Sequence, residues 1–176
     1  MEYALQEVKT QAKKLLKALK LDPSLVRAMQ IPLKKVAVSS PEVLKLKHCL
    51  SLVAIELGFK DWHEAQQLLS GSKPELTIIN MGSFFYPKGC GGFINEWFAD
   101  YSQARNTLVN SATPKWLLPY KNQFIVVEQE YIEVFKLDKA LLSSWAEIEH
   151  DMVASYNSVA WDKITCAVIR NRMRDY

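Results

Sequence analysis

The sequence is poor in glycine, proline and cysteine, and it has no long apolar run. Its 176 residues include six glycines and seven prolines, too few for a collagen-like or low-complexity chain. Its three cysteines, Cys49, Cys90 and Cys166, form no C-x-x-C pair, which excludes a zinc ribbon and a thioredoxin-like motif. The longest nearly uncharged stretches have about ten residues, whereas a membrane-spanning helix needs about 20.

The net charge is also small, at +3 from 22 basic and 19 acidic residues. This balance gives no reason to expect a polyanionic partner. The charge is unevenly distributed, because residues 1–73 carry 12 basic and 7 acidic side chains, and residues 74–176 carry 10 and 12. Hydrophobic residues make up 49% of the chain and charged residues 23%, which is typical of a folded globular protein.

The first ten residues contain no apolar segment like the core of a secretory signal. Scattered cysteines in apolar helical patterns, such as Cys49 and Cys166, behave as small buried hydrophobes in a reducing compartment. We therefore expect a cytoplasmic protein, and export by a signal-independent route stays open.

The first 70 residues are predicted to form a helical module. Apolar residues recur at helical spacing over residues 3–21, and Asp22 with Pro23 is typical of the start of a short second helix that Pro32 bounds. The strongest helical pattern is predicted to begin at Ser40 and to end at Gly58. Asp61 then opens another helix, with Glu64 as the third residue of a capping box.

After a predicted linker over residues 70–74, the pattern changes to short apolar runs. Residues 76–79, 83–86 and 93–98 are predicted as strands, the last two forming a β-hairpin around a glycine-rich turn. Residues 124–127 are predicted as another strand, and residues 114–119 as a connection. Helices are predicted from Asp100, over residues 131–137, from Ser144 to about Ser155, and from Asn157 or Ser158 to the end.

The resulting fold class is α+β, with an N-terminal helical module (residues 1–70) followed by a small antiparallel sheet packed with helices (residues 75–176). Residues 46–62 combine an amphipathic helix with Leu-Gly-Phe and a following tryptophan. This segment resembles a helical module of uncharacterised bacterial proteins that is also attached to some proteins labelled as glyoxalase-superfamily members. Residues 92–98 and 118–127 resemble hypothetical bacterial proteins. Neither resemblance implies a catalytic residue, and the His/Glu metal pattern of glyoxalase chemistry is missing.

The glycine-rich segment 86–93 is the first candidate site. Glycines allow backbone N–H groups to converge on an anion, and Cys90 between them is a candidate catalytic nucleophile if a nearby base activates it. The segment matches no phosphate-binding loop motif. A structural turn is therefore the favoured interpretation, and a thiol-dependent enzyme is the alternative.

The second candidate is a dense set of aromatic side chains. Because alternate residues of a strand point to opposite faces, not all of these rings fit one core. An exposed aromatic patch is typical of a binding surface. The predicted binding residues are Phe85, Tyr86, Asn95, Trp97 and Tyr120.

Two further patterns carry less weight. The helix–glycine–helix pattern of residues 40–70 has the outline of a helix-turn-helix, although its second helix contains no lysine or arginine. His150 lies with Glu147, Glu149 and Asp151 on one predicted helix, where a solvated face is expected rather than a metal site. We expect no metal and no cofactor.

The leading hypothesis is thus a non-catalytic interaction protein with a protein partner. Its alternatives are a thiol-dependent enzyme using Cys90 and a nucleic-acid-binding protein using residues 40–70.

Overall fold

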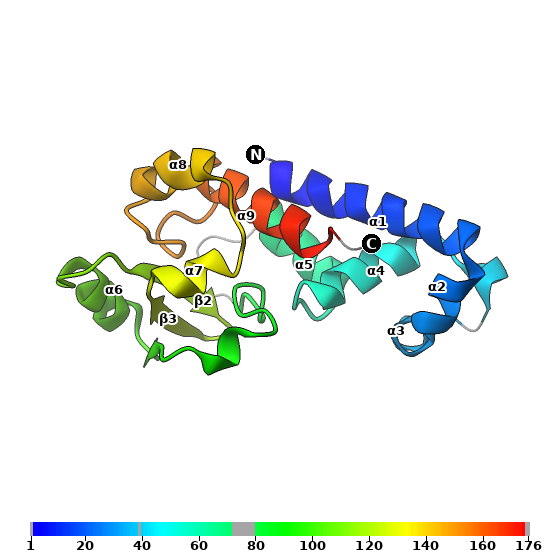
Figure 1. Ribbon diagram of the computed structural model, residues 1–176, viewed down its shortest axis with the longest axis horizontal. Coiled ribbons are helices and arrows are strands. Elements are labelled where there is room, and N and C mark those ends of the chain that lie inside the picture. Colours follow the sequence, from blue (N-terminus) through cyan, green and yellow to red (C-terminus); the bar gives the residue numbers. More distant parts are fainter. Residues whose placement is uncertain (1, 39, 72–79, 175–176) are drawn as a thin grey trace.

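The computed structural model describes residues 2–38, 40–71 and 80–174, which form an α+β fold (Figure 1). The predicted fold class is confirmed. The N-terminal helices are α1 (Tyr3–Leu21), α2 (Pro23–Ala28), α3 (Gln30–Lys35), α4 (Leu46–Glu56) and α5 (Trp62–Leu69). The later elements are β1 (Glu96–Phe98), α6 (Tyr101–Val109), β2 (Trp116–Tyr120), β3 (Gln123–Val127), α7 (Gln129–Glu133), α8 (Leu142–Glu147) and α9 (Val159–Arg172).

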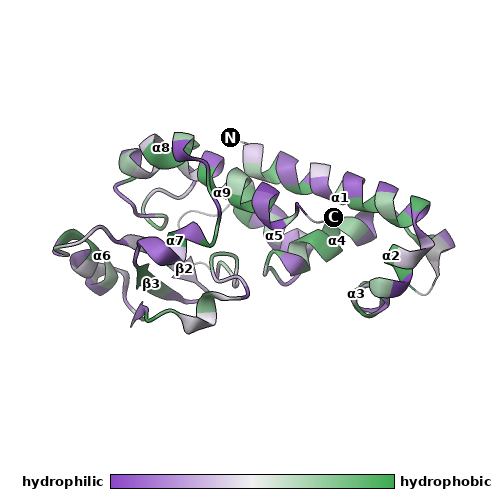
Figure 2. Cartoon of the chain, in the orientation of Figure 1, coloured by the Kyte–Doolittle hydropathy of each residue, from purple (hydrophilic) through white to green (hydrophobic). Residues whose placement is uncertain are grey.

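The long first helix is amphipathic, as its sequence predicts. Hydrophilic and hydrophobic bands alternate along α1 in Figure 2, and its buried stripe recurs at three- and four-residue intervals. The stripe faces α4 and α9. The buried residues of α1 are Ala4, Leu5, Val8, Gln11, Ala12, Leu15 and Leu19.

Capping residues set the helix starts that the sequence predicts best. The side chain of Asp22 accepts a hydrogen bond from the Ser24 N–H at 2.8 Å and begins α2. The side chain of Asp61 accepts the Glu64 N–H at 2.8 Å. The Glu64 carboxylate accepts the backbone N–H of Lys60, not the backbone N–H of Asp61 that a capping box requires.

The helix predicted from Ser40 begins later than expected. Residues Pro41–Val43 form a single 3-10 turn, and α4 begins at Leu46. Lys45 between them is extended, and Leu44 is buried. Insertion of Leu44 into the core therefore interrupts what the local pattern predicts as one helix. Pro32 likewise lies inside α3 rather than bounding α2, which ends at Ala28.

The sheet has three antiparallel strands in the order β1-β3-β2. Strands β2 and β3 form a hairpin, in which Leu118 lies opposite Ile125. Lys121 in the connecting turn has a φ of 49°. On the other side of β3, Trp97 of β1 also lies opposite Ile125. The prediction of a strand at residues 124–127 is confirmed.

The hairpin predicted from residues 83–86 and 93–98 is wrong. Residues 82–86 form turns, and only Glu96–Phe98 of the second segment is a strand. The turn buries both Phe84 and Phe85, which a strand would point to opposite faces. Ser83 N–H donates to Gly58 O at 3.0 Å, so this segment is fixed against the α4–α5 turn.

The connection predicted at residues 114–119 is also wrong, because Trp116–Tyr120 is strand β2. Pro119 has no N–H to donate to a neighbouring strand. The strand forms nevertheless because three consecutive residues before Pro119, Trp116, Leu117 and Leu118, are buried. The predicted linker at residues 70–74 and the predicted strand at residues 76–79 lie mainly or wholly outside the described residues.

Helix α9 packs along α1, although the two are at opposite ends of the sequence (Figure 1). Asp162 of α9 is buried, and its carboxylate accepts the N–H groups of Tyr3 and Ala4, both at 2.9 Å. A carboxylate at this position satisfies N–H groups that have no partner within α1, and it interacts favourably with the helix dipole. Asp162 therefore fixes the start of α1 on α9.

The C-terminal turn of α9 makes a second connection. Arg172 donates to the carbonyl oxygens of Glu56, Leu57 and Phe84 at 2.6–3.1 Å. Burial lowers the pKa of Arg172 from its usual value, partly offset by Glu56. The buried apolar residues form one cluster with members from both parts of the chain. The division into residues 1–70 and 75–176 stays a prediction.

Among the residues described, no helix has the length and apolar character needed to cross a membrane.

Candidate functional site

Three of the predicted binding residues meet at one place in the fold. Tyr86 is the last residue of the turn at residues 82–86, Trp97 is the central residue of β1, and Tyr120 ends β2. The ring centroids of Tyr86 and Tyr120 are 5.1 Å apart, and those of Trp97 lie 5.6 Å from Tyr86 and 5.3 Å from Tyr120. We call these three side chains the ring cluster.

The ring cluster is partly open to solvent. Trp97 is 44% exposed, and Tyr86 and Tyr120 are half-buried. Ile94, three residues before Trp97, is 99% exposed. At most about 10 Å of extended backbone separates Ile94 from Trp97. Ile94 and Trp97 thus both leave apolar surface unburied in the isolated chain.

Asn95 is half-buried between Ile94 and the start of β1. Its Oδ1 is buried, and no described residue donates a hydrogen bond to it. An acceptor buried without a partner costs about 1–3 kcal/mol. Asn95 therefore adjoins the ring cluster in the chain, but no bond from the described residues to its Oδ1 fixes it there.

Phe85, the fifth predicted binding residue, is not part of this surface. It is fully buried, and its ring packs edge-on against Phe84 at 4.7 Å and Phe135 at 6.2 Å. Its carbonyl oxygen accepts a hydrogen bond from the Tyr131 hydroxyl at 2.7 Å. Phe85 therefore holds residues 82–86 against the core and cannot contact a partner in the folded protein.

Cys90 does not have the environment of an activated nucleophile. It begins the 3-10 turn Cys90–Gly92 and is fully buried, unlike the exposed thiol that the glycine-rich sequence suggested. Burial raises the pKa of the Cys90 thiol, and a hydrogen bond with Tyr131 and the charge of Arg172 only partly oppose this. The preceding Gly89 has a φ of 97°, so the glycine supplies a left-handed turn.

The histidines have other partners. His48 Nδ1 accepts the Lys45 N–H at 3.1 Å, and His63 hydrogen-bonds Gln67 on the exposed side of α5. The ring of His150 stacks on Trp116, with centroids 4.8 Å apart. Each imidazole thus has a contact that accounts for its position without involving Cys90.

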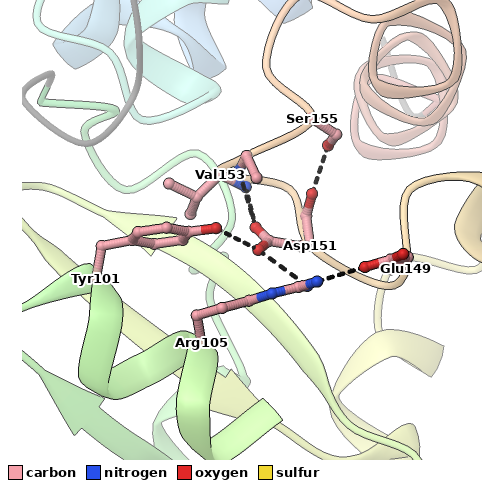
Figure 3. Close-up of polar contacts among 7 residues, drawn as sticks. Tyr101, Arg105, Glu149, Asp151, Val153 and Ser155 are labelled. Carbon is pink, nitrogen blue, oxygen red and sulfur yellow. Dashed lines mark hydrogen bonds and ion pairs between the residues drawn. The ribbon is translucent and has the colours of Figure 1, made fainter. Parts of the chain in front are cut away.

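The densest polar cluster surrounds Asp151, which is 1% exposed (Figure 3). Oδ2 accepts from the Tyr101 hydroxyl at 2.8 Å and from Arg105 Nη1 at 3.3 Å. Oδ1 accepts the N–H groups of Val153 and Ala154 at 2.8 and 2.9 Å. We call Asp151, Tyr101 and Arg105 the Asp151 cluster.

The prediction that residues 147–151 form a solvated acidic helix face is wrong at Asp151, which is buried. Helix α8 ends at Glu147, and Glu149 and His150 follow with φ values of 50° and 59°. These left-handed residues turn the chain so that Leu117 N–H of β2 donates to His150 O at 2.9 Å, and Met152 N–H donates to Leu117 O at 3.0 Å. Asp151 therefore points inward while Glu149 stays outside and pairs with Arg105.

Every oxygen of the Asp151 carboxylate has two donors, so its hydrogen-bonding capacity is used within the protein. Burial and the hydrogen bond to Asp151 raise the pKa of Tyr101 well above its usual value, so its phenol stays protonated and donates to Asp151. The arrangement is that of a structural network joining α6 to residues 149–155.

Sequence reasoning missed this network because its partners lie 46 and 50 residues apart in the chain. The one local signal was the Asx-type pattern in which Asp151 accepts from residues two and three positions later. Nothing in the sequence near Tyr101 or Arg105 indicated a carboxylate partner.

Helices α4 and α5 keep the outline that suggested nucleic-acid binding. The exposed side chains of α5 are His63 and Gln66, and neither is a cation that neutralises phosphate. Within residues 2–38, 40–71 and 80–174, no group of three or more His, Cys, Asp or Glu side chains is placed to hold a metal ion.

Comparison with known proteins provides no relative: no family model, no curated protein and no solved structure matches the chain. The resemblances of residues 46–62, 92–98 and 118–127 therefore stay predictions.

Proposed function

We propose that the protein is a non-catalytic binding protein whose partner protein docks on the ring cluster and Ile94. The observation that carries the proposal is the convergence of three rings from separate segments, with Trp97 and Ile94 left exposed. Tryptophan and tyrosine are the residues that most often dominate the binding energy of protein interfaces.

The spacing of the rings favours a protein partner over a small cation. An aromatic cage for a quaternary ammonium needs rings set apart around a gap. Here the centroids are 5.1–5.6 Å apart, so the rings pack on one another. Lys121 Nζ already lies 5.2 Å from the centroid of Tyr120. The cluster therefore supports contact with apolar side chains of a partner rather than enclosure of a ligand.

The position of Trp97 in the sheet indicates how a partner approaches. β1 is an outer strand, and so is β2. The outer edge of β2 is covered at Leu117 by its bridge to Asp151. β1 has no comparable bridge among the described residues, so a partner segment has access both to its backbone edge and to Trp97.

The direct test places a photoreactive amino acid at position 94 and, as a matched control, at position 109. Val109 is also exposed, at 63%, but lies at the end of α6. We expect crosslinks to one protein from position 94 and none to that protein from position 109, in cells that express the chain naturally.

Affinity measurements with the purified partner complete the test. Ile94→Asp and Trp97→Ala are expected to raise the Kd at least about tenfold, and Val109→Asp less than about twofold. Equal crosslinking from both positions, or unchanged affinity of both ring-cluster variants, would refute the proposal.

A further inference from the structure

A cavity of about 630 Å³ lies between the start of α1, residues 136–141 and one face of α9. Its volume is in the range of small-molecule sites, which are typically about 300–1,000 Å³. The cavity shares no residue with the ring cluster or the Asp151 cluster.

Positive side chains converge on this cavity from two walls. Lys163, Arg170 and Arg174 lie at intervals of seven and four residues, which places them on one face of α9 and its C-terminal turn. Lys136 comes from the segment after α7. Residues 74–176 contain more acidic than basic side chains, 12 against 10, yet four of those ten basic residues line this one cavity.

Acidic residues neutralise these cations only in part. Arg170 pairs with Glu7 at 3.0 Å. Asp138 also lines the cavity and adds one negative charge, so the four lining cations still outnumber the nearby carboxylates of Glu7 and Asp138. Lys136, Lys163 and Arg174 have no ion pair with any described residue. Like charges held together repel one another, and an anion bound between them relieves that repulsion.

The wall that carries Lys136 is fixed to α9. The amide nitrogen of Asn171 donates to the carbonyl oxygens of Phe135 and Lys136 at 3.1 and 2.7 Å. Lys136 itself has a φ of 49°, a left-handed conformation that is unusual for a lysine. These bonds hold the backbone after α7 against α9, which fixes the backbone position of Lys136 on the second wall of the cavity.

Apolar side chains lie between the cations. Leu141 and Ala167 are half-buried parts of the lining, and Tyr3 at the start of α1 is 60% exposed. A ligand that is only an inorganic anion would leave this surface unused. A molecule with both a phosphate group and a ring matches both parts of the lining.

We propose that this cavity binds a small phosphorylated molecule of nucleotide size. Lys163, Arg170 and Arg174 contact its phosphate oxygens, and its ring lies against Tyr3 and Leu141. Arginine matches phosphate geometry with two parallel N–H donors, and lysine supplies a mobile point charge. The cations share one cavity of about 630 Å³ with apolar side chains, a combination that favours a small molecule over a nucleic acid.

The test is isothermal titration calorimetry of the full chain with four probes: ADP, inorganic pyrophosphate, adenosine and a single-stranded oligonucleotide. We expect ADP and pyrophosphate to bind, ADP more tightly, with affinity that falls as salt rises from about 20 to about 150 mM. Adenosine is expected to bind at least about tenfold more weakly than ADP, because it lacks the charged groups.

Charge reversal locates the binding. Lys163→Glu and Arg174→Glu are expected to weaken ADP binding at least about fivefold. Lys139→Glu is the matched control, since Lys139 is exposed and adjacent in sequence to Asp138 and Ala140 but does not line the cavity. We expect it to change the affinity less than about twofold.

Four outcomes would overturn the proposal: no binding of ADP or pyrophosphate at millimolar concentration, binding of adenosine as tight as that of ADP, binding of the oligonucleotide alone, or equal weakening by Lys139→Glu and Lys163→Glu. The last would mean that general surface charge, rather than this cavity, attracts the anion.

Discussion

The Asp151 cluster and the ring cluster are both built from residues far apart in the chain, but they differ in what they leave unsatisfied. In the Asp151 cluster, two side chains and two backbone N–H groups saturate one buried carboxylate. In the ring cluster, the side chains contact one another and leave Trp97 44% exposed. A saturated network contributes to stability, whereas an incompletely buried apolar surface remains available for binding.

The two clusters are linked through the sheet. Leu117 of β2 carries the bridge to Asp151, and Tyr120 of the same strand carries a ring of the ring cluster. The Asp151 cluster also fixes α6, which packs on β1 and β3. The polar network thus stabilises the scaffold on which the rings converge.

Among substitutions within the two clusters, the largest expected effect is that of Asp151→Ala. The variant leaves the Tyr101 hydroxyl, Arg105 and two backbone N–H groups without their acceptor, in a site where Asp151 is 1% exposed. We expect the free energy of unfolding to fall by about 3 kcal/mol. Urea denaturation followed by circular dichroism measures this loss.

The matched control is Glu149→Gln, which removes the outer carboxylate bound by Arg105 but not the buried one. Its side chain is 73% exposed, so we expect a loss below about 1 kcal/mol. Equal losses in the two variants would show that the buried carboxylate has no special structural role.

The sequence was most informative where structure is decided locally. Asp22, Asp61 and Asp100 are the N-caps of α2, α5 and α6, and each was predicted from its own side chain and the helical pattern that follows. Ser158, the N-cap of α9, was one of two predicted candidates, the other being Asn157. A capping side chain bonds a backbone group two or three residues away, so the sequence contains the whole interaction.

Long-range contacts explain what the sequence could not indicate. Residues 82–86 form a turn because Ser83 and Gly82 bond to Gly58 and Lys121, which no local pattern reveals. The density of aromatic residues indicated many rings in this part of the chain. It could not separate Tyr86, which joins the ring cluster, from Phe85, which enters the core. Deciding between the two requires the direction of each side chain, and this follows from the turn.

A moderate effect is expected from Trp97→Ala. The variant removes ring contacts with Tyr86 and Tyr120, each worth about 0.5–1.5 kcal/mol in comparable aromatic pairs, but little buried area. We expect a loss of unfolding free energy of about 1 kcal/mol in urea denaturation.

The same substitution at Trp145, which is 3% exposed, is the control and is expected to cost about 3–5 kcal/mol. If Trp97→Ala were as destabilising as Trp145→Ala, Trp97 would be a core residue. The contrast between a stabilising network and an available surface would then fail.

The smallest effect concerns pH and lies at the edge of the Asp151 cluster. Burial lowers the pKa of His150 below its usual value of about 6.5, and a hydrogen bond with the backbone of Lys115 opposes this only in part. The unfolded chain therefore binds a proton at His150 more readily than the folded chain. His150 therefore lowers the free energy of unfolding as the pH falls through about 6.5. It has no such effect well above that pH.

His150→Phe isolates this contribution, because a phenyl ring can stack on Trp116 as the imidazole does but does not titrate. As the pH falls from about 7.5 to about 5, the wild type is expected to lose unfolding free energy relative to this variant. If the difference in unfolding free energy between the wild type and His150→Phe did not depend on pH, His150 would bind a proton equally well in the folded and the unfolded chain. Burial of His150 in the turn beside Asp151 would then have no effect on its protonation.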